Sequence, residues 1–363
     1  MKITLDNIIY SNVTQGGVSN YWFELSKYLL ENQEDQVSFY EEYNCKLNFH
    51  RQQLLIPENK IILNNSLIKS SIKRRLSPVE IKTKDYFLYH SSYYRPVTGS
   101  VFFSEITTLH DFTHNYYSSF IKRLVHNKMK YSAIKRSKGI ICISGNTYQD
   151  LKKFCSPSKN QKVAIIYNGV SNDYYPLIEE RYASEKYLNA IGIDDPYVLF
   201  VGGRINYKNF SFVIKLLKEI PAIKLVIVGP SLTRSELNLF DKETLKRTCV
   251  VSDVKNSELN ILYNFAHALL YPSSYEGFGI PIIEAMKAGC PVLALQNSSI
   301  MEVSGEAAIL FKELNIGLFK KALARLSESN FRKEITEKGF LQAEFFSWDK
   351  CCKETYEFYK EIY

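Results

Sequence analysis

Two glutamates that flank a glycine turn are the residues of this chain best suited to hold a polar ligand. Glu276 stands beside Gly277 and Gly279, and Glu284 follows Pro281 along a predicted helix. Backbone N–H groups at a helix start hold phosphate or other polar oxygens, and carboxylates accept hydrogen bonds from hydroxyls. We expect the helix dipole to keep both carboxylates ionised. Such a site suits two hydroxyl-bearing rings joined by a diphosphate, as in a nucleotide sugar.

The segments around this turn predict a strand, a tight turn and a helix. The apolar run Ala268–Tyr271 predicts a buried strand, and the helix after Pro281 has an apolar inward side and stops at Gly289 before Pro291. For two isolated glutamates, an ordinary helix-start role would be the better interpretation. The glycine turn between strand and helix favours binding instead.

The string Tyr-Glu-Gly-Phe-Gly-Ile-Pro-Ile-Ile-Glu-Ala-Met-Lys-Ala-Gly-Cys-Pro-Val at 275–292 resembles the donor-site signature of retaining glycosyltransferases of family 4. The resemblance implies an α/β protein of GT-B architecture, with two facing Rossmann-like domains and a C-terminal helix that crosses back to the first. We expect an acceptor-binding domain at 1–175, a nucleotide-sugar-binding domain at 176–345 and the returning helix at 346–363. The family transfers sugars from nucleotide donors without a metal.

Two cations form the second candidate cluster. Arg204 and Lys208 follow the strand-like Tyr197–Val201 and two glycines, and a helix is expected from Asn209. Cations at a phosphate-binding turn can neutralise the charge that develops on a departing nucleoside diphosphate. Elsewhere in a sequence, an arginine and a lysine with this spacing would be interpreted as two solvated surface cations. The preceding Phe-Val-Gly-Gly and the resemblance favour the catalytic role.

The resemblance also implies roles for residues in both halves. Glu276 would hold the transferred sugar, Glu284 the ribose hydroxyls, and a turn after the predicted strand Cys249–Val254 would contact the base through its backbone. His110, which with Asp111 ends the predicted strand Val101–Leu109, would contact the donor sugar. The expected catalytic residues are His110, Arg204, Lys208 and Glu276. The expected donor-binding residues are Gly16, Gly17, Arg204, Lys208, Val254, Glu276, Gly277, Phe278, Gly279, Ile280 and Glu284.

Composition fits a two-domain globular chain of 363 residues with 45% hydrophobic and 23% charged residues. Its seven cysteines lack metal-binding spacing and indicate thiols in a reducing compartment. No apolar run reaches the length of a membrane span, and the N-terminus does not look like a signal peptide, so we expect a cytosolic protein. Without an Asp-x-Asp motif, we expect no metal or other cofactor.

The N-terminal half carries most of the net charge of +8. Residues 1–185 hold 24 Lys and Arg against 17 Asp and Glu, which gives +7, and residues 186–363 hold 22 against 21, which gives +1. One basic cluster includes Lys69 and Arg75, and a second lies at 120–138, where apolar residues alternate with basic ones. We expect the second to be a helix with a solvated face over a core, although contact with an anionic membrane is plausible. No nucleic-acid-binding motif is present.

The resemblance therefore implies a retaining hexosyltransferase with a glycan acceptor, similar to bacterial enzymes of O-antigen or capsule synthesis. The resemblance implies an undecaprenyl-diphosphate-linked acceptor at the inner face of the cytoplasmic membrane. GDP-mannose and UDP-hexoses both remain open as donors. The alternatives are a GT-B-fold sugar-nucleotide epimerase and a non-enzymatic membrane-surface protein.

Overall fold

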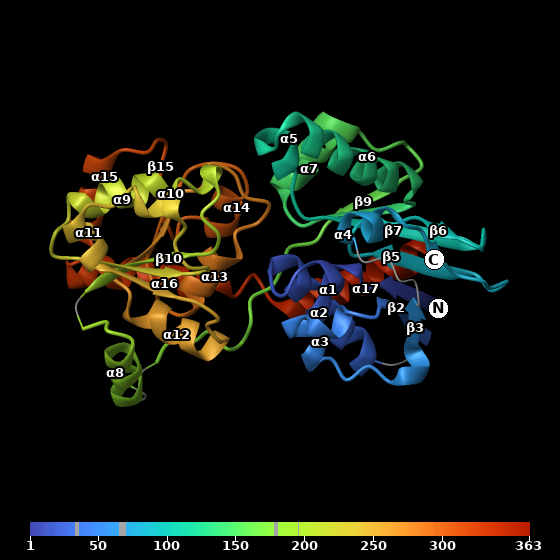
Figure 1. Cartoon of the computed structure of the whole chain (residues 1–363), viewed down its shortest axis with the longest axis horizontal. Helices are drawn as coiled ribbons and strands as arrows, with labels where there is room; N and C mark the ends of the chain where they lie inside the picture. Colours follow the sequence, from blue (N-terminus) through green and yellow to red (C-terminus); the bar gives the residue numbers. More distant parts are fainter. Residues whose placement is uncertain (33–35, 65–69, 178–180, 195) are drawn as a thin grey trace. The chain divides into compact units, whose positions relative to one another are not determined.

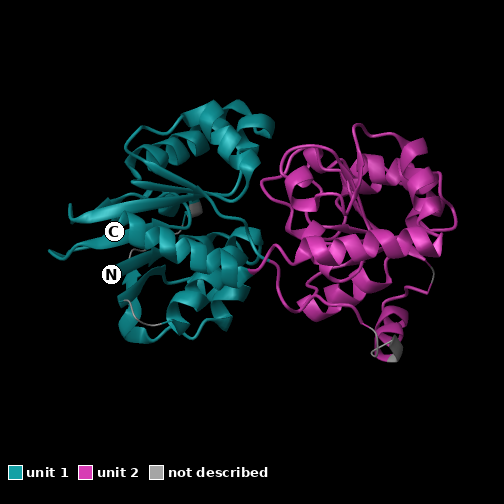
Figure 2. Cartoon of the chain, turned by 180° about the vertical axis from the view of Figure 1, so that it is seen from behind, with its two compact units in different colours: residues 1–169, 348–363 teal, residues 170–347 magenta. Residues whose placement is uncertain are grey.

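The computed structural model describes residues 1–32, 36–64, 70–177, 181–194 and 196–363 (Figure 1). Its contacts divide the chain into two compact units (Figure 2). Unit 1 comprises Met1–Gly169 together with Trp348–Tyr363, and unit 2 comprises Val170–Ser347. The sequence had placed the divisions after residues 175 and 345. Lys69, one member of the first basic cluster, lies outside the described residues.

Unit 1 is built on a parallel sheet with the strand order β3-β2-β1-β5-β7-β8-β9. The chain runs outward from β1 to β3 and then returns to the other side of β1 with β5, so the strand order reverses between β1 and β5. The strands are β1 Lys2–Asp6, β2 Gln36–Glu42, β3 Ile61–Asn64, β5 Phe87–Ser91, β7 Phe103–Leu109, β8 Gly139–Cys142 and β9 Lys162–Ile165. A separate short parallel pair joins β4 Val79–Glu80 to β6 Val97–Thr98.

Helices follow the strands of unit 1 in the order expected of an α/β domain. They are α1 Ile8–Asn12, α2 Gly17–Glu31, α3 Phe49–Gln53, α4 Ser71–Leu76, α5 Thr113–Tyr117, α6 Phe120–Arg136 and α7 Gly145–Cys155. Short 3₁₀ turns lie at Cys45–Leu47 and Glu58–Lys60. Ser144 caps α7 by accepting a hydrogen bond from Thr147 N, as its residue type predicts.

The last helix, α17 Trp348–Ile362, belongs to unit 1, which confirms the expected return of the chain. Its buried face packs against the sheet and α2. Tyr359 Oη lies 2.5 Å from His90 Nδ1, and the Trp348 ring meets the Tyr21 ring edge to face at 6.2 Å between centroids. The amphipathic spacing of its aromatic residues therefore serves packing within unit 1.

Unit 2 contains a second parallel sheet with the order β12-β11-β10-β13-β14-β15. The strands are β10 Tyr197–Val201, β11 Lys224–Val228, β12 Thr248–Val251, β13 Ala268–Tyr271, β14 Val292–Leu295 and β15 Ile309–Phe311. The helices are α8 Arg181–Ala190, α9 Phe210–Lys218, α10 Arg234–Leu237, α11 Lys242–Lys246, α12 Asn256–Phe265, α13 Ile280–Lys287, α14 Ile300–Ser304, α15 Ile316–Arg325 and α16 Ser329–Ala343. Apolar side chains of β10, α9 and α15 meet in one buried core.

Two predicted strand ends are wrong, at β1 and at β12. The first strand was predicted over Lys2–Ile9, but it stops at Asp6, and Ile8–Asn12 forms α1. Ile8 and Ile9 are buried from this helix rather than from the sheet. The strand predicted to reach Val254 ends at Val251, and Asp253 then takes a positive φ of 54° that turns the chain.

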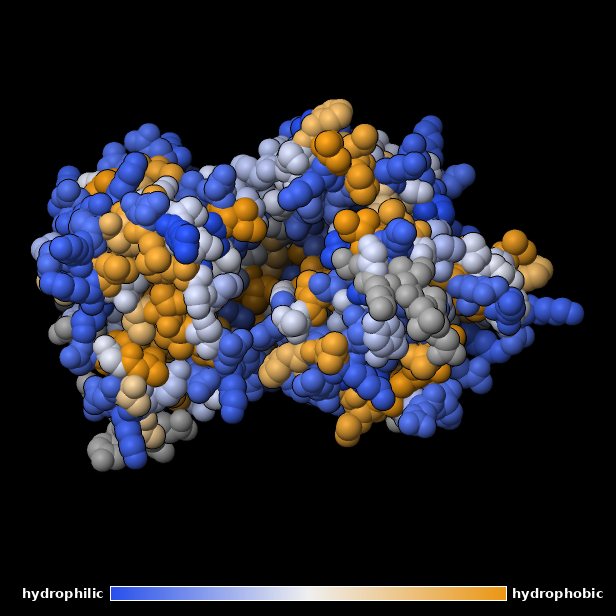
Figure 3. All heavy atoms as spheres, in the orientation of Figure 1, coloured by the Kyte–Doolittle hydropathy of each residue, from blue (hydrophilic) through white to orange (hydrophobic). Residues whose placement is uncertain are grey.

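The helix predicted in the second basic stretch is present as α6, but its packing differs from the prediction. Its C-terminal half is anchored by Lys130, Ala133 and Ile134, which are buried. Phe120 and Leu124, expected over a core, are 68% and 60% exposed. Figure 3 shows hydrophobic atoms gathered at the surface over α5 and α6. The first half of α6 therefore exposes apolar side chains instead of packing them against a core.

A buried charge network joins the ends of β1, β2 and β5 in unit 1. Arg95 donates through Nε to Asp6 Oδ2 at 2.9 Å and through Nη1 to Glu42 Oε1 at 2.7 Å, and Nη2 also bonds Asp6. All three side chains are fully buried. A buried charge is tolerated only when it is paired and hydrogen-bonded, as these are. The network fixes the sheet edge at the point where the strand order reverses.

Candidate functional site

The candidate site of unit 2 lies where its strand order reverses. β10 has β11 on one side and β13 on the other, so the chain leaves β10 in one direction and later returns to its opposite side. In open parallel sheets, ligands bind beyond the carboxyl ends of the strands at such a switch point. The turn after β10 carries Arg204 and Lys208, and the turn after β13 carries Glu276 and Gly277. The topology therefore brings the two predicted clusters to one place.

The two turns meet through an ion pair and a set of hydrogen bonds. Lys208 Nζ lies 3.2 Å from Glu276 Oε1, with both side chains largely buried. Asn209 Nδ2 donates to Pro272 O and to Ser274 Oγ, each at 2.7 Å, and Ser274 N donates to Tyr207 O at 2.7 Å. Asn209 holds the left-handed backbone conformation with φ 51°, which asparagine tolerates better than most residues. These bonds fix the position of Lys208 relative to Glu276.

Arg204 is held by protein groups rather than solvated. Its Nε donates to Glu236 Oε1 at 2.7 Å, and its Nη2 donates to the carbonyl oxygens of Pro230 and Ser231 at 2.7 and 2.9 Å. Its side chain is 3% exposed, and its Nη1 is buried with no hydrogen-bond partner. A buried guanidinium nitrogen without an acceptor is costly unless a ligand supplies one. The simple surface-cation interpretation is therefore wrong for Arg204.

Two glycines keep the space beside these cations open. Gly202 has φ 108°, and a Cβ there would stand 3.6 Å from Lys208 Nζ. Gly279 has φ 106°, and a Cβ there would stand 3.2 Å from Ile282 Cδ1. Side-chain-bearing residues rarely adopt such a backbone conformation, so the turns require glycine. Gly279 is the cap of α13, which begins at Ile280 with Pro281 in its first turn, as the sequence predicted.

The turn at 276–278 is braced from the loop that follows β14. Ser298 Oγ accepts a hydrogen bond from Glu276 N at 3.0 Å, and Ser299 Oγ donates to the carbonyl oxygens of Glu276 and Phe278, each at 2.9 Å. Ser299 is fully buried, and the Phe278 ring is also buried, edge to face with Phe346 at 5.6 Å between centroids. The Phe278 side chain therefore packs inside unit 2 and does not reach a ligand.

Glu284 lies on α13 with two tyrosines around it. Tyr263 Oη donates to Glu284 Oε2 at 3.0 Å, and the Tyr174 hydroxyl also bonds this carboxyl. Burial raises the pKa of Glu284 to about 7, and the two tyrosine hydrogen bonds limit the rise. The expectation that the helix dipole keeps Glu284 fully ionised is therefore wrong, because loss of solvent outweighs it. Burial raises the pKa of the Tyr271 hydroxyl, and the charges of Glu276 and Glu284 raise it further.

Val254 lies in the turn between β12 and α12, close to the turn that follows β11. It is half-buried, and Ser252 Oγ donates to Gly229 O at 2.9 Å, tying this turn to the end of β11. The backbone at Val254 is therefore held at the carboxyl edge that carries Arg204.

In unit 1, the predicted residues follow β1 and β7 at the carboxyl edge of its sheet. Gly16 caps α2, which begins at Gly17, and nothing lies within 4 Å of the place where a Gly16 Cβ would stand. The half-buried His110 ring meets the ring of Tyr21, from α2, edge to face at 5.0 Å between centroids. Burial lowers the pKa of His110 to about 4, so its imidazole is neutral at pH 7.

Asp111 is held by hydrogen bonds in the turn that follows β7. Its Oδ1 accepts from Thr113 N at 2.9 Å, and its carbonyl oxygen accepts from the buried Lys130 Nζ at 2.5 Å. Burial raises the pKa of the Asp111 carboxyl, but the Lys130 ammonium and the Thr113 N–H outweigh it and lower the pKa overall. Asp111 shapes the turn after β7.

Sequence reasoning missed the residues that position the site. They are Tyr174, Asn209, Glu236, Tyr263, Ser274, Ser298 and Ser299. Only Glu236 carried a local signal, because Thr233 and Glu236 form a capping box at the start of α10. The others are polar residues whose partners lie on remote segments.

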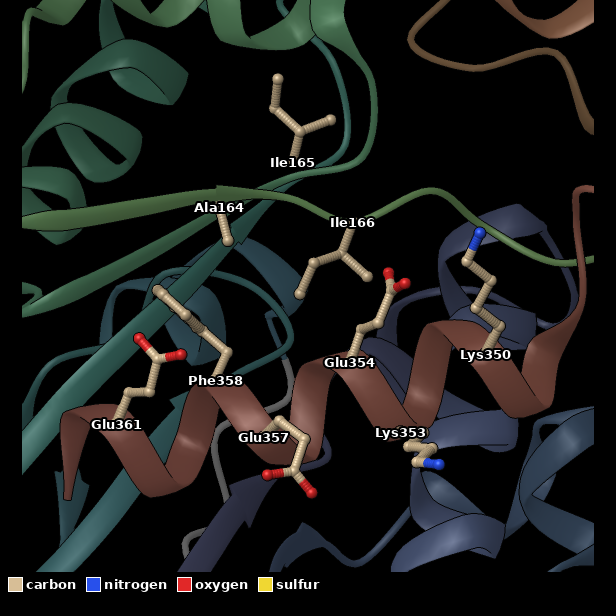
Figure 4. Close-up of a pocket in the computed structure, with 9 residues that line it drawn as sticks. All are labelled: Ala164, Ile165, Ile166, Lys350, Lys353, Glu354, Glu357, Phe358 and Glu361. Carbon is tan, nitrogen blue, oxygen red and sulfur yellow. The ribbon is translucent and has the colours of Figure 1, made fainter.

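A large groove of unit 1 lies apart from these residues. It has a volume of about 700 Å³ and runs between β9 and α17, where Ile166 and Glu354 face one another across it (Figure 4). Lysines and glutamates of α17 line its rim, so their charges largely offset one another. In the described ranges, no three His, Cys, Asp or Glu side chains gather as they would around a metal ion. None of the described helices is both long and apolar enough to span a bilayer.

Two family models match consecutive parts of the chain. Residues 15–174 match the Glycosyltransferase Family 4 model, and residues 184–342 match the model of Glycosyl transferases group 1. The second match contains the turn after β10, the turn after β13 and α13.

Curated relatives include bacterial and archaeal proteins. The O-antigen chain mannosyltransferase B of Escherichia coli is 37% identical over 108 residues, which cover 30% of this chain and 28% of that protein. The O-antigen chain mannosyltransferase RfbU of Salmonella typhimurium is 29% identical over 57% of this chain and 56% of its own. An uncharacterised glycosyltransferase of Methanocaldococcus jannaschii is 23% identical over 100% of this chain and 99% of its own. The chain thus matches about a quarter to a half of the two mannosyltransferases.

Solved structures share the fold at low sequence identity. Sucrose-phosphate synthase from Thermosynechococcus elongatus has a TM-score of 0.72 at 18% identity, covering 100% of this chain and 99% of its own. Anabaena HepE in complex with UDP-glucose has a TM-score of 0.72 at 15% identity and covers 100% of both chains. These likenesses establish the GT-B fold that the sequence predicted.

Proposed function

Because the chain belongs to the glycosyltransferases of family 4 and carries their group 1 domain, we propose that it is a retaining hexosyltransferase. It takes a hexose from a nucleotide sugar and joins it to a hydroxyl of a glycan acceptor. The observation that carries the proposal is the Lys208–Glu276 pair at the switch point of unit 2, beside the buried Arg204. A cation and a carboxylate 3.2 Å apart suit a ligand that combines a diphosphate with hydroxyls.

In this proposal, the cations bind the diphosphate of the donor. Arg204 Nη1, which is buried without an acceptor, and Lys208 Nζ donate to its oxygens. The N–H groups of Gly279 and Ile280 add further donors at the start of α13. As the sugar–oxygen bond breaks, negative charge grows on the diphosphate, and these donors stabilise it more strongly than they stabilise the bound substrate.

The carboxylates bind the hydroxyls on either side of the diphosphate. Glu276 accepts from the hydroxyls of the transferred sugar, and Glu284 from the ribose hydroxyls. Tyr263 and Tyr174 keep Glu284 in place by donating to it. The Val254 backbone contacts the base. For Gly16, Gly17 and His110 of unit 1, contact with the donor stays a prediction from the family resemblance.

The proposed reaction forms the new bond on the face that the leaving group vacates. The acceptor hydroxyl oxygen attacks the anomeric carbon while the bond to the diphosphate oxygen breaks. The hydroxyl proton passes to that departing oxygen, so no enzyme nucleophile takes part. The chain's contribution is to position the reactants and to stabilise charge. We propose that no metal or other cofactor is needed.

Two donor classes are compatible with the site. The relatives named as O-antigen mannosyltransferases support a GDP-mannose donor and a role in bacterial surface-polysaccharide synthesis. The structural neighbour solved with UDP-glucose supports a UDP-hexose donor. For the acceptor, we propose an undecaprenyl-diphosphate-linked glycan at the cytoplasmic face of the membrane, as the family resemblance implies.

The test is a panel of nucleotide sugars offered to the full chain in the presence of EDTA. Thermal shift with GDP and UDP identifies the base, and transfer assays with the matching sugars identify the hexose. The expected result is nucleoside diphosphate released only when an acceptor glycan is present, with the anomeric configuration of the product unchanged by NMR.

Other outcomes would overturn the proposal. Interconversion of one nucleotide sugar into another without an acceptor would assign an epimerase. Inversion at the anomeric carbon would exclude the retaining reaction. Absence of binding to every nucleotide in the panel would leave the basic surface of unit 1 as the functional part of the chain.

A further inference from the structure

An apolar surface covers the first half of α6 in unit 1. Phe120, Ile121, Leu124 and Val125, which we call the α6 patch, are 68%, 74%, 60% and 44% exposed. Their spacing places all four on one face of the helix, with exposed Lys128 continuing that face one turn later. The C-terminal half of α6 is buried and holds the helix on unit 1. Four large exposed apolar side chains in under two turns indicate an interaction surface.

The charge around the α6 patch has a single sign. Between Asp111 and Asp150 the sequence contains seven basic residues and no acidic one. Lys122, Arg123 and Lys128 lie within the patch or directly beside it, and the Arg123 guanidinium stands 5.7 Å from the centroid of the Phe120 ring. Lys130, by contrast, is buried and serves the turn at Asp111. The partner surface should therefore be anionic and should accept apolar side chains at the same time.

We propose that the α6 patch docks the protein on an anionic lipid bilayer. The helix would lie in the plane of the interface, with the patch among the acyl chains near the headgroups. The basic side chains would reach back to lipid phosphates along their apolar stems. Each such cation strengthens binding to an anionic bilayer about fivefold at physiological ionic strength. The inference does not rest on the proposed transfer reaction.

Two other partners fit the same surface less well. In a symmetric dimer the α6 patch would face its own copy, so Lys122, Arg123 and Lys128 would oppose like charges. A nucleic acid would match the charge, but Phe120 is the single ring of the four patch residues on which a base could stack, and the other three are aliphatic. A bilayer satisfies both the charge and the aliphatic side chains.

The experiment is co-sedimentation of the full chain with vesicles. Vesicles of phosphatidylcholine alone are compared with vesicles that contain 30% phosphatidylglycerol, at about 0.1 and 0.5 M salt. We expect binding to the anionic vesicles only, and weaker binding at high salt. Ile121→Glu with Leu124→Glu should reduce binding at least tenfold. Lys122→Gln, Arg123→Gln and Lys128→Gln together should reduce it about a hundredfold.

Matched controls carry the same changes elsewhere on the surface. Leu341→Glu replaces a leucine of α16 that is 62% exposed, and Lys242→Gln neutralises an exposed lysine of α11. Both should bind vesicles as the parent does. All the patch variants should keep the parent's melting temperature and its nucleotide-induced thermal shift, because their side chains are exposed.

Four results would overturn the proposal. Equal binding to neutral and anionic vesicles, or unchanged binding of the patch variants, would exclude the surface. A concentration-dependent dimer that Ile121→Glu with Leu124→Glu abolishes would assign the surface to a second copy. Salt-sensitive binding to RNA or DNA without vesicle binding would assign it to nucleic acid. None of these results bears on the sugar-transfer reaction, which is measured with a water-soluble acceptor.

Discussion

Lys208 Nζ lies 3.2 Å from Glu276 Oε1, and this pair joins the turn after β10 to the turn after β13. Asn209 fixes the same two turns through its bonds to Pro272 and Ser274. A cation is thus held beside a carboxylate before any ligand arrives. Preorganised charge of this kind costs little reorganisation during a reaction.

Removing the cation should therefore affect turnover more than folding. Lys208→Met is expected to lower kcat for sugar transfer about 10²- to 10³-fold, because the departing diphosphate loses a positioned charge. Glu276, whose side chain is 13% exposed, loses its cation, so we also expect a smaller loss of about 1–3 kcal/mol in the free energy of unfolding. Steady-state kinetics and thermal melts measure both. The control is Lys218→Met, which breaks an exposed ion pair with Asp241 and should leave kcat unchanged.

The carboxylate behind Arg204 should matter for both stability and donor binding. Glu236→Gln weakens the bonds that hold the buried guanidinium, and we expect a loss of about 1–2 kcal/mol in the free energy of unfolding. Affinity for the nucleoside diphosphate should fall as Arg204 loses its orientation. Urea unfolding and calorimetric titration check the two effects. Glu243→Gln, which removes an exposed ion pair on α11, should change neither.

Glu284 should make stability and donor affinity depend on pH. Its pKa is about 7 in the folded chain and about 4.5 when exposed, so the folded state binds the extra proton between these values. The free energy of unfolding should thus fall as pH rises from about 4.5 to 7, by up to about 3 kcal/mol, and level off above 7. Glu284→Gln should remove this slope, as urea unfolding over the same pH range would show.

Donor affinity should have the opposite pH dependence. Ribose hydroxyls donate to the ionised carboxylate, so affinity for the nucleoside diphosphate should rise between pH 6 and 8. In Glu284→Gln the affinity should be lower and flat with pH. A wild-type affinity that is independent of pH in this range would exclude Glu284 as the hydroxyl acceptor.

The two glycine turns should respond differently to a methyl group. Gly279→Ala places a side chain at φ 106° against Ile282, and we expect a loss of about 1–2 kcal/mol together with weaker donor binding. Gly16→Ala has an extended backbone and open space around the new methyl. It should leave the melting temperature unchanged, so any loss of activity would report contact with the donor. Thermal melts and transfer kinetics on both variants separate the cases.

The buried arginine of unit 1 should be essential for its stability. Arg95→Leu leaves Asp6 and Glu42 buried without a cation, and we expect a loss of about 3–5 kcal/mol in the free energy of unfolding. Lys82→Leu, which removes only an exposed ion pair with Glu80, should give no measurable change. An Arg95 variant as stable as the parent would show that Asp6 and Glu42 do not depend on this cation.

The sequence by itself determined the local structure of the site. Ala268–Tyr271, the glycine turn and the helix from Ile280 are present as predicted, because apolar runs, glycines and a helix-start proline restrict the backbone locally. The parallel α/β class followed from the same alternation of strands and helices. The ends of strands were predicted less well, as at Ile8, because the sequence shows that a residue is apolar but not whether a strand or a helix buries it.

Only the tertiary structure decided which side chains meet. The strand order β11-β10-β13 brings Lys208 to Glu276, and the fold buries Glu284 next to Tyr263. Burial raises the pKa of the Glu284 carboxyl, and the Tyr263 hydrogen bond limits the rise. The tertiary structure also left the first half of α6 exposed, although its sequence could equally have covered a core. Local spacing fixes the face of a helix on which a residue lies. What packs against that face depends on segments remote in the chain, which no local pattern records.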